Sequence, residues 1–445
     1  MIHPIAQWFE KVLVGYSPRR TAAIAPYIPQ ALMDQLQHIG FRHQLKYVNA
    51  RSKFYRERFA ELGINVNRIT HPSQMGSFFT YAEEVRQRPS EDFLCAKPQI
   101  AFETTGTTSA IPKRIYFSNE EMDIVGRFAA VGMWNLGLRP DDRLVSAFDY
   151  SFWVSGPTIR AATNVIGCFH VEAGKIDPME FYERSRSYNF NVIVGEPSWL
   201  MRLSEIAERE GIWPVKFFLA GGENMTEQTR EYIEQVWQSN VYLNYGQTEA
   251  FGALGLECPE KRGYHLNELN FFYEIADPDE DGYGKLAYTT LSRKVMPLVR
   301  YHANDVTRII EERCPCGLPS RMLAKVRCRA DEMIVCGMGN ISPWIFEQLL
   351  RDIDGIGDDW QVAIVRPGIK DVVEFRIETT DSSVDRQTIE KTIEQRLQKD
   401  FPDFWKNKIM GLYDLAFSYS RVGSLRTGRK LLRLVDQREQ LLFSR

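Results

Sequence analysis

Apolar positions change their spacing along the chain, and each spacing predicts a different kind of element. Residues 31–55 carry apolar side chains at helical spacing with Lys and Arg between them, so we expect residues 1–90 to be mostly helical. From 120 to 240, short apolar runs alternate with amphipathic stretches, of which 227–238 is an example. This alternation of strands and helices is typical of a layered α/β domain.

The short apolar runs of this region read as strands that end in small or polar residues. In an open α/β sheet, ligands bind outside the carboxyl ends of the strands. Three turns are therefore expected to face one crevice: residues 150–156, 221–223 and 245–249.

After residue 330 the pattern changes to strand, strand, helix and strand. These segments are 360–365, 372–378, 384–397 and 415–419. The change follows a glycine-rich loop at 337–339, and the stretch beyond it has the size of a small α+β domain. We therefore predict an N-terminal domain at 1–330 and a C-terminal domain at 331–445.

The composition is that of an ordinary globular protein. Of 445 residues, 44% are hydrophobic and 25% are charged, and the formal net charge is −3. So small a charge gives no electrostatic reason to expect nucleic acid or an acidic membrane as partner. No run of 18 apolar residues predicts a transmembrane helix, and residues 1–10 lack the pattern of a signal peptide. The seven cysteines, an odd number, favour a reducing compartment, so we expect a cytoplasmic protein.

The stretch from Asn244 to Glu249 follows a short apolar run and combines side chains that suit a nucleotide. The ring of Tyr245 can stack on a base, and Gly246 lets the backbone come close to a ligand. Thr248 can meet a phosphate, and Glu249 can hold Mg²⁺ against it. Alone, the stretch reads as a loop with a solvated glutamate. The remaining motifs favour the nucleotide site.

A hydroxyl-rich turn lies between two predicted strands, 99–102 and 115–117. It contains Thr104, Thr105, Gly106, Thr107, Thr108 and Ser109. These hydroxyls, the backbone N–H groups and Lys113 at the end of the turn offer donors to a polyphosphate. The spacing is not that of the P-loop of nucleotide triphosphatases. The alternative is a threonine-rich hairpin turn.

Four soft ligands are grouped further along the chain: Cys258, His265, Cys314 and Cys316. The last two stand in a Cys-Pro-Cys-Gly knuckle that aims two thiolates at one point. Three thiolates and an imidazole make a closed tetrahedral zinc set, which leaves no open position and is therefore structural. The alternative is a group of free cytosolic thiols.

Two more stretches carry charged side chains that can bind the ribose or a phosphate of a nucleotide. We expect the apolar run that starts at Pro297 to form a strand that ends in Asp305, a carboxylate able to chelate ribose hydroxyls. Residues 424–436 form a basic loop with glycine beside it, which can bring a Lys to a phosphate as a point charge. Alone, this loop reads as a solvated basic tail.

Together these motifs resemble the adenylate-forming enzymes (acyl-CoA synthetases, luciferases and peptide-synthetase adenylation domains), and among them the phenylacetate–CoA ligase family. The resemblance runs from about residue 35 to 436. Its most specific motifs follow the family's order: Ala220–Glu223, Tyr245–Glu249, Glu257–Cys258, Gly263–His265, Tyr273–Pro278, Arg300–Asp305 and Cys314–Gly317. The implied fold is a large layered α/β N-terminal domain with a small mobile α+β C-terminal domain.

The resemblance implies a two-step reaction with ATP and Mg²⁺. A carboxylate attacks the α-phosphate to give an acyl-AMP and pyrophosphate, and a nucleophile then releases AMP. Thr104 to Lys113 would hold the β- and γ-phosphates, while Thr248 would bond the α-phosphate. The other nucleotide-binding residues implied are Gly222, Glu223, Tyr245 on adenine, Gly246, Glu249 on Mg²⁺, and Asp305 and Arg329 on the ribose.

The resemblance also implies roles beyond the nucleotide. Lys430 would bridge the acid and the α-phosphate, Asp331 would be the hinge of the C-terminal domain, and the Cys/His group matches positions that hold zinc in some relatives. The acid pocket would be lined by Tyr150, Phe152, Trp153 and Gly221. Its aromatic walls favour an aryl or alicyclic acid.

The chain departs from the family's pattern in three places. Ser109 stands where Gly is usual, with one more residue before Pro112; the loop 337–340 is one residue longer; and Arg429 is inserted before Lys430. We expect an ATP-dependent, AMP-forming acid ligase with CoA as acceptor. The alternatives are transfer to an amino acid, as in the coronafacate ligase branch, or to a carrier-protein thiol. A non-catalytic nucleotide-binding regulator fits less well, because the catalytic side chains are retained.

Overall fold

The computed structural model describes most of the chain, in two compact units. The described residues are 15–104, 113–174, 176–223, 225–252, 254–330, 334–336, 339–367, 371–380, 384–409, 411–426 and 431–438. The larger unit comprises Met1–Met225, Arg230–Ala303 and Thr307–Lys325, and the smaller one Thr226–Thr229, Asn304–Val306 and Val326–Arg445. The main break thus falls a few residues before the expected boundary. The assignment of separate domains at 1–330 and 331–445 stays a prediction.

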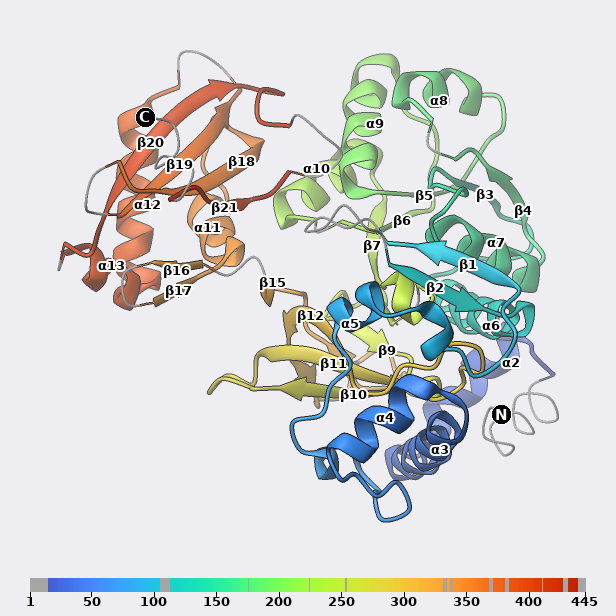
Figure 1. The fold of residues 1–445 in the computed structure, drawn as a ribbon. Coiled ribbons are helices and arrows are strands. Elements are labelled where there is room, and N and C mark those ends of the chain that lie inside the picture. Colours follow the sequence, from blue (N-terminus) through green and yellow to red (C-terminus); the bar gives the residue numbers. More distant parts are fainter. Residues whose placement is uncertain are drawn as a thin grey trace. The chain divides into compact units, whose positions relative to one another are not determined.

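The larger unit is built on a nine-stranded sheet in the order β13-β14-β9-β8-β7-β6-β5-β3-β4. Figure 1 labels its strands β3 to β7. Its parallel strands are β3 (Arg143–Ser146), β4 (Phe169–Glu172), β5 (Val192–Gly195), β6 (Phe217–Gly221) and β7 (Asn240–Tyr245). Its antiparallel strands are β8 (Gly255–Leu256), β9 (Tyr264–Leu266), β13 (Ile309–Ile310) and β14 (Met322–Leu323).

Five helices cover both faces of the parallel strands. They are α6 (Asn119–Asn135), α7 (Ser155–Ile166), α8 (Pro178–Ser185), α9 (Pro197–Glu210) and α10 (Glu227–Trp237). Because successive strand residues point to opposite faces, Val192 and Val194 pack in one apolar cluster and Ile193 in another. Burial on both faces explains why β5 and β6 are uninterrupted apolar runs.

The N-terminal part is helical, as predicted, in the range that the structure describes. It contains α2 (Pro18–Ile24), η2 (Ala25–Tyr27), α3 (Gln30–Arg51), α4 (Lys53–Glu61), η3 (Pro72–Met75), α5 (Ala82–Gln87) and η4 (Ser90–Asp92). The helical spacing over 31–55 covers α3 and the start of α4. The chain leaves the helix at Ser52, whose Oγ accepts from the N–H of Tyr55 at 3.3 Å and starts α4.

Two further groups of strands lie wholly or partly in the larger unit, since residues 304–306 of β12 belong to the smaller one. The hairpin of β1 (Ile100–Glu103) and β2 (Arg114–Phe117) is antiparallel, as expected. In a second sheet, β10 (Phe271–Ala276) pairs with β11 (Gly284–Thr290), and β12 (Tyr301–Thr307) follows in the order. The expected strand from Pro297 to Asp305 is wrong at its start. Arg300 has a left-handed φ of 46°, so the strand begins at Tyr301 and Asp305 lies within it.

The smaller unit has a four-stranded sheet in the order β20-β19-β18-β21. Its elements are β15 (Cys328–Arg329), β16 (Ile334–Cys336), β17 (Gly339–Ile341), α11 (Pro343–Leu350), β18 (Ile356–Val365), β19 (Asp371–Thr379), α12 (Arg386–Asp400), α13 (Pro402–Ile409), β20 (Tyr413–Arg421) and β21 (Leu434–Asp436). All four segments expected beyond residue 360 form as predicted. A separate core that includes Phe346, Phe375 and Ile393 holds them together. Within the described ranges, no helix combines the length and the hydropathy needed to cross a bilayer.

Candidate active site

The carboxyl ends of the parallel strands carry the turns that the sequence placed there. Strands β6 and β7 are in register through Gly221 and Asn244, so the turns that follow them start side by side. A Cβ on Gly221 would lie 3.1 Å from the carbonyl oxygen of Asn244. A side chain at this position would therefore press on the neighbouring strand end, which would have to shift by a few tenths of an ångström.

The turn after β7 is tight. The N–H of Gly252 donates to the carbonyl of Gln247 at 2.8 Å, and a Cβ on Gly246 would lie only 1.9 Å from the carbonyl oxygen of Gly252. The single 3₁₀ turn η5 (Thr248–Ala250) sits between them, with Thr248 half-buried and Glu249 buried. The alternative of a loop with a solvated glutamate does not hold, because the closed turn directs Glu249 inward.

Glu249 forms a buried ion pair with Lys113, at the end of the β1–β2 connection. The hydroxyl of Tyr301 donates to the same Glu249 oxygen, Oε1, at 2.8 Å, and accepts from Lys113 Nζ at 3.1 Å. Burial opposes ionisation of Glu249, but the charge of Lys113 and these hydrogen bonds outweigh it and hold the pKa of Glu249 below its ordinary value. The site therefore holds an ionised carboxylate beside a cation.

A buried arginine fixes the backbone of the same turn. Arg293 donates from Nη1 to the carbonyl oxygen of Glu249, and its guanidinium lies over the ring of Phe117, 4.6 Å from the ring centroid. Phe251 is stacked on Phe117, with 3.9 Å between the ring centroids. Burial lowers the pKa of Arg293. This layer ties the turn after β7 to strand β2.

The hydroxyl-rich turn is described only at its two ends. The N–H of Thr104 donates to the carbonyl of Lys113 at 3.0 Å and closes the neck of the turn. Thr104 Oγ1 is buried with no hydrogen-bond partner among the described residues. The other predicted members, Thr105, Gly106, Thr107 and Thr108, lie outside the described residues. An orphaned hydroxyl at the neck is compatible with a ligand there.

The predicted acid-pocket residues lie next to this neck. The N–H of Glu103 donates to the carbonyl of Phe152 at 2.9 Å, so the loop with Tyr150, Phe152 and Trp153 contacts the end of β1. The Phe152 side chain is 63% exposed and is open to a ligand. The guanidinium of Arg160 lies 5.3 Å from the ring centroid of Tyr150.

The loop after β6 carries two predicted nucleotide-binding residues. Gly222 has a left-handed φ of 84° and lies against Glu196, the N-cap of α9. Glu223 Oε2 accepts from the N–H of Ser198 at 3.2 Å, and its Oε1 has no partner among the described residues. The turn is thus fixed at one oxygen and leaves the other for a ligand.

The remaining predicted nucleotide contacts are divided between the two units. The ring of Tyr245 lies 5.7 Å from that of Tyr264, centroid to centroid. In the smaller unit, Asp305 pairs with Arg329 across β12 and β15, with 3.8 Å between Oδ1 and Nη1. The two ribose-binding candidates are therefore neighbours.

The predicted catalytic Lys430 and hinge Asp331 lie outside the described residues. The chain on both sides of 427–430 is described, and one carboxylate ties the two sides together. Asp359 accepts from Arg426 Nε at 2.9 Å and lies 3.3 Å from Arg433 Nη2. Glu378 accepts from the N–H of Leu425 at 2.7 Å.

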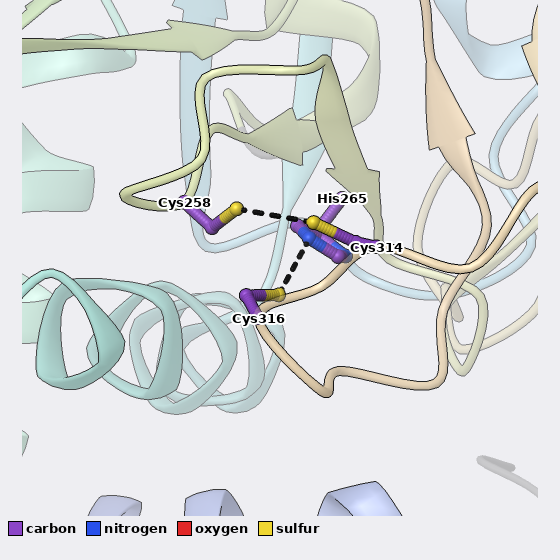
Figure 2. A group of neighbouring side chains, drawn as sticks. All are labelled: Cys258, His265, Cys314 and Cys316. Carbon is purple, nitrogen blue, oxygen red and sulfur yellow. Dashed lines mark hydrogen bonds between the residues drawn. The ribbon is translucent and has the colours of Figure 1, made fainter.

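The four predicted zinc ligands come together in the larger unit (Figure 2). Their ligand atoms all lie within 4.8 Å of one another. Cys258 Sγ lies 3.5 Å from Cys314 Sγ, and Cys316 Sγ lies 3.2 Å from His265 Nε2. Tetrahedral zinc, with a Zn–S distance of about 2.3 Å, separates its ligand atoms by about 3.3–3.8 Å. The donor set therefore fits structural zinc.

Sequence reasoning assigned no role to Tyr301 or Arg293. Tyr301 lies inside the motif Arg300–Asp305 on which the family resemblance rests, and this position could have marked it as a functional residue. Arg293 carries no local signal, because its partners lie 44 positions or more away along the chain.

No protein-family model matches the chain. Similar curated proteins include the phenylacetate–coenzyme A ligase of Pseudomonas putida, 26% identical over 362 residues that span 78% of this chain and 82% of the relative. The phenylacetate–coenzyme A ligase of Thermus thermophilus is 25% identical over 373 residues, 80% of this chain and 83% of the relative.

Solved structures share the fold. 2-Hydroxyisobutyryl-CoA ligase, in the postadenylation state with R3-HIB-AMP, has a TM-score of 0.78 at 19% identity over 93% of this chain and 92% of its own. The amide bond synthetase McbA of Marinactinospora thermotolerans has a TM-score of 0.57 at 14% identity over 80% and 70%. The predicted fold class and resemblance are confirmed. The chain is thus similar in sequence to phenylacetate–coenzyme A ligases and shares the fold of 2-hydroxyisobutyryl-CoA ligase.

Proposed function

We propose that the chain is an ATP-dependent, AMP-forming carboxylic acid ligase that uses CoA as acceptor. The observation that carries this proposal is the contact between the phosphate-turn Lys113 and the Mg²⁺-ligand candidate Glu249, beside Thr248 at the carboxyl edge of the sheet. The curated relatives, which are phenylacetate–coenzyme A ligases, support CoA as the acceptor.

In the proposed first step, a carboxylate oxygen of the acid attacks the α-phosphorus of ATP, and pyrophosphate leaves with its electron pair. Like charges must approach, so the protein's main task is to neutralise and align them. Lys113 and Lys430 supply cations, and Thr248 supplies a hydroxyl donor. In the second step the thiolate of CoA attacks the acyl carbonyl, and AMP leaves.

Two metals fit the residues present. Glu249 is a buried, ionised carboxylate, the oxygen ligand that Mg²⁺ prefers, and Mg²⁺ would add charge neutralisation at the phosphates. Cys258, His265, Cys314 and Cys316 would hold zinc in a closed site that supports the fold and takes no part in the reaction.

The acid is an aryl or alicyclic carboxylic acid, in keeping with the aromatic side chains of Tyr150, Phe152 and Trp153. A panel of acids in ATP–pyrophosphate exchange tests this. Exchange that depends on an acid of this class supports the proposal, and no exchange with any acid contradicts adenylation.

Lys430 is tested in the same assay. Lys430→Ala is expected to abolish acid-dependent exchange, with a larger effect on kcat than on KM, because its contact is used mainly in the transition state. Lys399→Ala, at an exposed position on α12 of the same unit, is the matched control and should retain full exchange. Unchanged exchange in Lys430→Ala would remove this residue from the mechanism.

The acceptor is tested by supplying the enzyme with acid, ATP and either CoA or a mixture of amino acids. The products are then identified by their masses. Acyl-CoA as the main product supports the proposal. An amide as the main product would favour the amino acid ligase alternative, and no transfer to either acceptor would direct attention to a carrier-protein thiol.

A further inference from the structure

Tyr301 lies at the first position of β12, and its hydroxyl touches both members of the Lys113–Glu249 ion pair. It donates to Glu249 Oε1 at 2.8 Å and accepts from Lys113 Nζ at 3.1 Å. All three side chains are buried. Lys113 and Tyr301 both bind Oε1, so neither occupies the second carboxylate oxygen, Oε2.

The backbone around Tyr301 is clamped on both sides. The N–H of Thr80 donates to the carbonyl of Arg300 at 3.1 Å, and the N–H of His302 donates to the carbonyl of Thr80 at 2.9 Å. The ring of Tyr301 packs against Tyr288 with 5.5 Å between centroids. The hydroxyl is therefore fixed by strand pairing and packing, whereas the ammonium of Lys113 stands on a chain of four methylene groups.

This difference matters if Lys113 turns to the nucleotide, as the proposed function requires. Glu249 then loses the ammonium of Lys113 while it remains buried, and a buried carboxylate depends on its remaining hydrogen-bond donors. The Tyr301 hydroxyl is a neutral donor, so the charge of the phosphates does not draw it away from Glu249 as it draws the ammonium of Lys113. It can keep Oε1 bonded whether Lys113 is on the carboxylate or on the nucleotide.

We propose that Tyr301 is a positioning residue that holds Glu249 by Oε1 so that Oε2 is presented to Mg²⁺. The inference rests on the proposed function. It predicts that Tyr301 acts through Glu249 and not on the acid. Loss of its hydroxyl should therefore change the dependence on Mg²⁺ and leave the KM for the acid unchanged.

The test is Tyr301→Phe, which keeps the buried ring and removes only the hydroxyl. In ATP–pyrophosphate exchange, the Mg²⁺ concentration for half-maximal rate should rise about tenfold and kcat should fall about tenfold to a hundredfold, as for loss of a hydrogen bond to a charged group. The KM for the acid should stay within about twofold. Tyr182→Phe is the matched control, since its hydroxyl donates to the carbonyl of Gly211 at 2.6 Å near α8.

Binding of Mg·ATP by calorimetry separates this inference from the proposed function. A wild-type chain that neither exchanges pyrophosphate nor binds Mg·ATP overturns both. If the wild type is active and Tyr301→Phe has unchanged Mg²⁺ dependence and kcat, only the positioning role of Tyr301 fails. A variant that loses thermal stability with no change in Mg²⁺ dependence shows a purely structural hydroxyl and also overturns the inference.

Discussion

Lys113 and Glu249 form a buried ion pair although 136 positions separate them in the chain. One belongs to the end of the hydroxyl-rich turn and the other to the turn after β7. Their contact brings together two motifs that the sequence analysis assigned to the same nucleotide. In the proposed function, it places opposite charges where a polyphosphate and its cation meet.

Replacement of Lys113 by Met should destabilise the larger unit. The variant leaves Glu249 buried without its cation, which costs about 3–5 kcal/mol for a buried pair broken on one side. Urea unfolding at pH 7 measures this. Lys285→Met is the control, because Lys285 and its partner Asp277 are exposed, and the loss there should stay below about 1 kcal/mol.

The effect of Lys113→Met should depend on pH in a defined direction. In the wild type, the pKa of Glu249 is lower in the folded chain than in the unfolded chain, where it is about 4.3. The ion pair therefore stabilises the folded state fully above the unfolded pKa. Its contribution to the free energy of unfolding is lost as the pH falls through the folded pKa. In the variant, burial without the cation favours a protonated Glu249. The stability difference between wild type and variant should therefore shrink from pH 7 towards pH 4; a constant difference would contradict the pairing.

The zinc proposal predicts about one equivalent of zinc per purified chain. Cys316→Ser should lower the zinc content and the melting temperature together, because it removes one of four ligands. Cys95→Ala, a buried cysteine outside the cluster, should keep the metal. Metal analysis decides the outcome, and less than about half an equivalent in the wild type would count against the site.

Gly246→Ala should strongly impair adenylation. The new Cβ would lie 1.9 Å from the carbonyl oxygen of Gly252, so the turn that carries Thr248 and Glu249 must open. We expect more than a tenfold (about 1.4 kcal/mol) loss in ATP–pyrophosphate exchange. The control is Gly40→Ala in helix α3. Its Cβ would lie 3.5 Å from the side chain of Leu291, which is an ordinary van der Waals contact, so activity should be kept. Equal exchange rates in both variants would show that the turn tolerates a side chain.

Asp359→Asn should weaken the smaller unit. The change removes the negative charge between Arg426 and Arg433, and Arg433 is mostly buried, with burial lowering its pKa. We expect a loss of about 3 kcal/mol in unfolding free energy and a lower exchange rate, since the two chain segments beside 427–430 lose their common anchor. Asp352→Asn, at a side chain that is 61% exposed, should change neither quantity.

The local pattern of residue types along the chain was sufficient to predict most of the helices and strands and the candidate zinc ligands. The strands β5, β6 and β7, the helix α10 and the four segments beyond residue 360 follow from apolar periodicity, which reports burial directly. The break at Ser52 and the late start of β12 were missed. Both depend on backbone conformation at single residues, which periodicity does not register.

The sequence by itself determined the α/β alternation, the family resemblance and the residue types gathered for a nucleotide, a carboxylic acid and zinc, because these follow from spacing and side-chain chemistry. Only the tertiary structure decided that Glu249 is buried and not solvated, that Lys113 neutralises it, and that Tyr301 and Arg293 hold its side chain and backbone. These facts depend on which distant segments the sheet brings into contact, and on the loss of solvent that makes each buried charge require a partner.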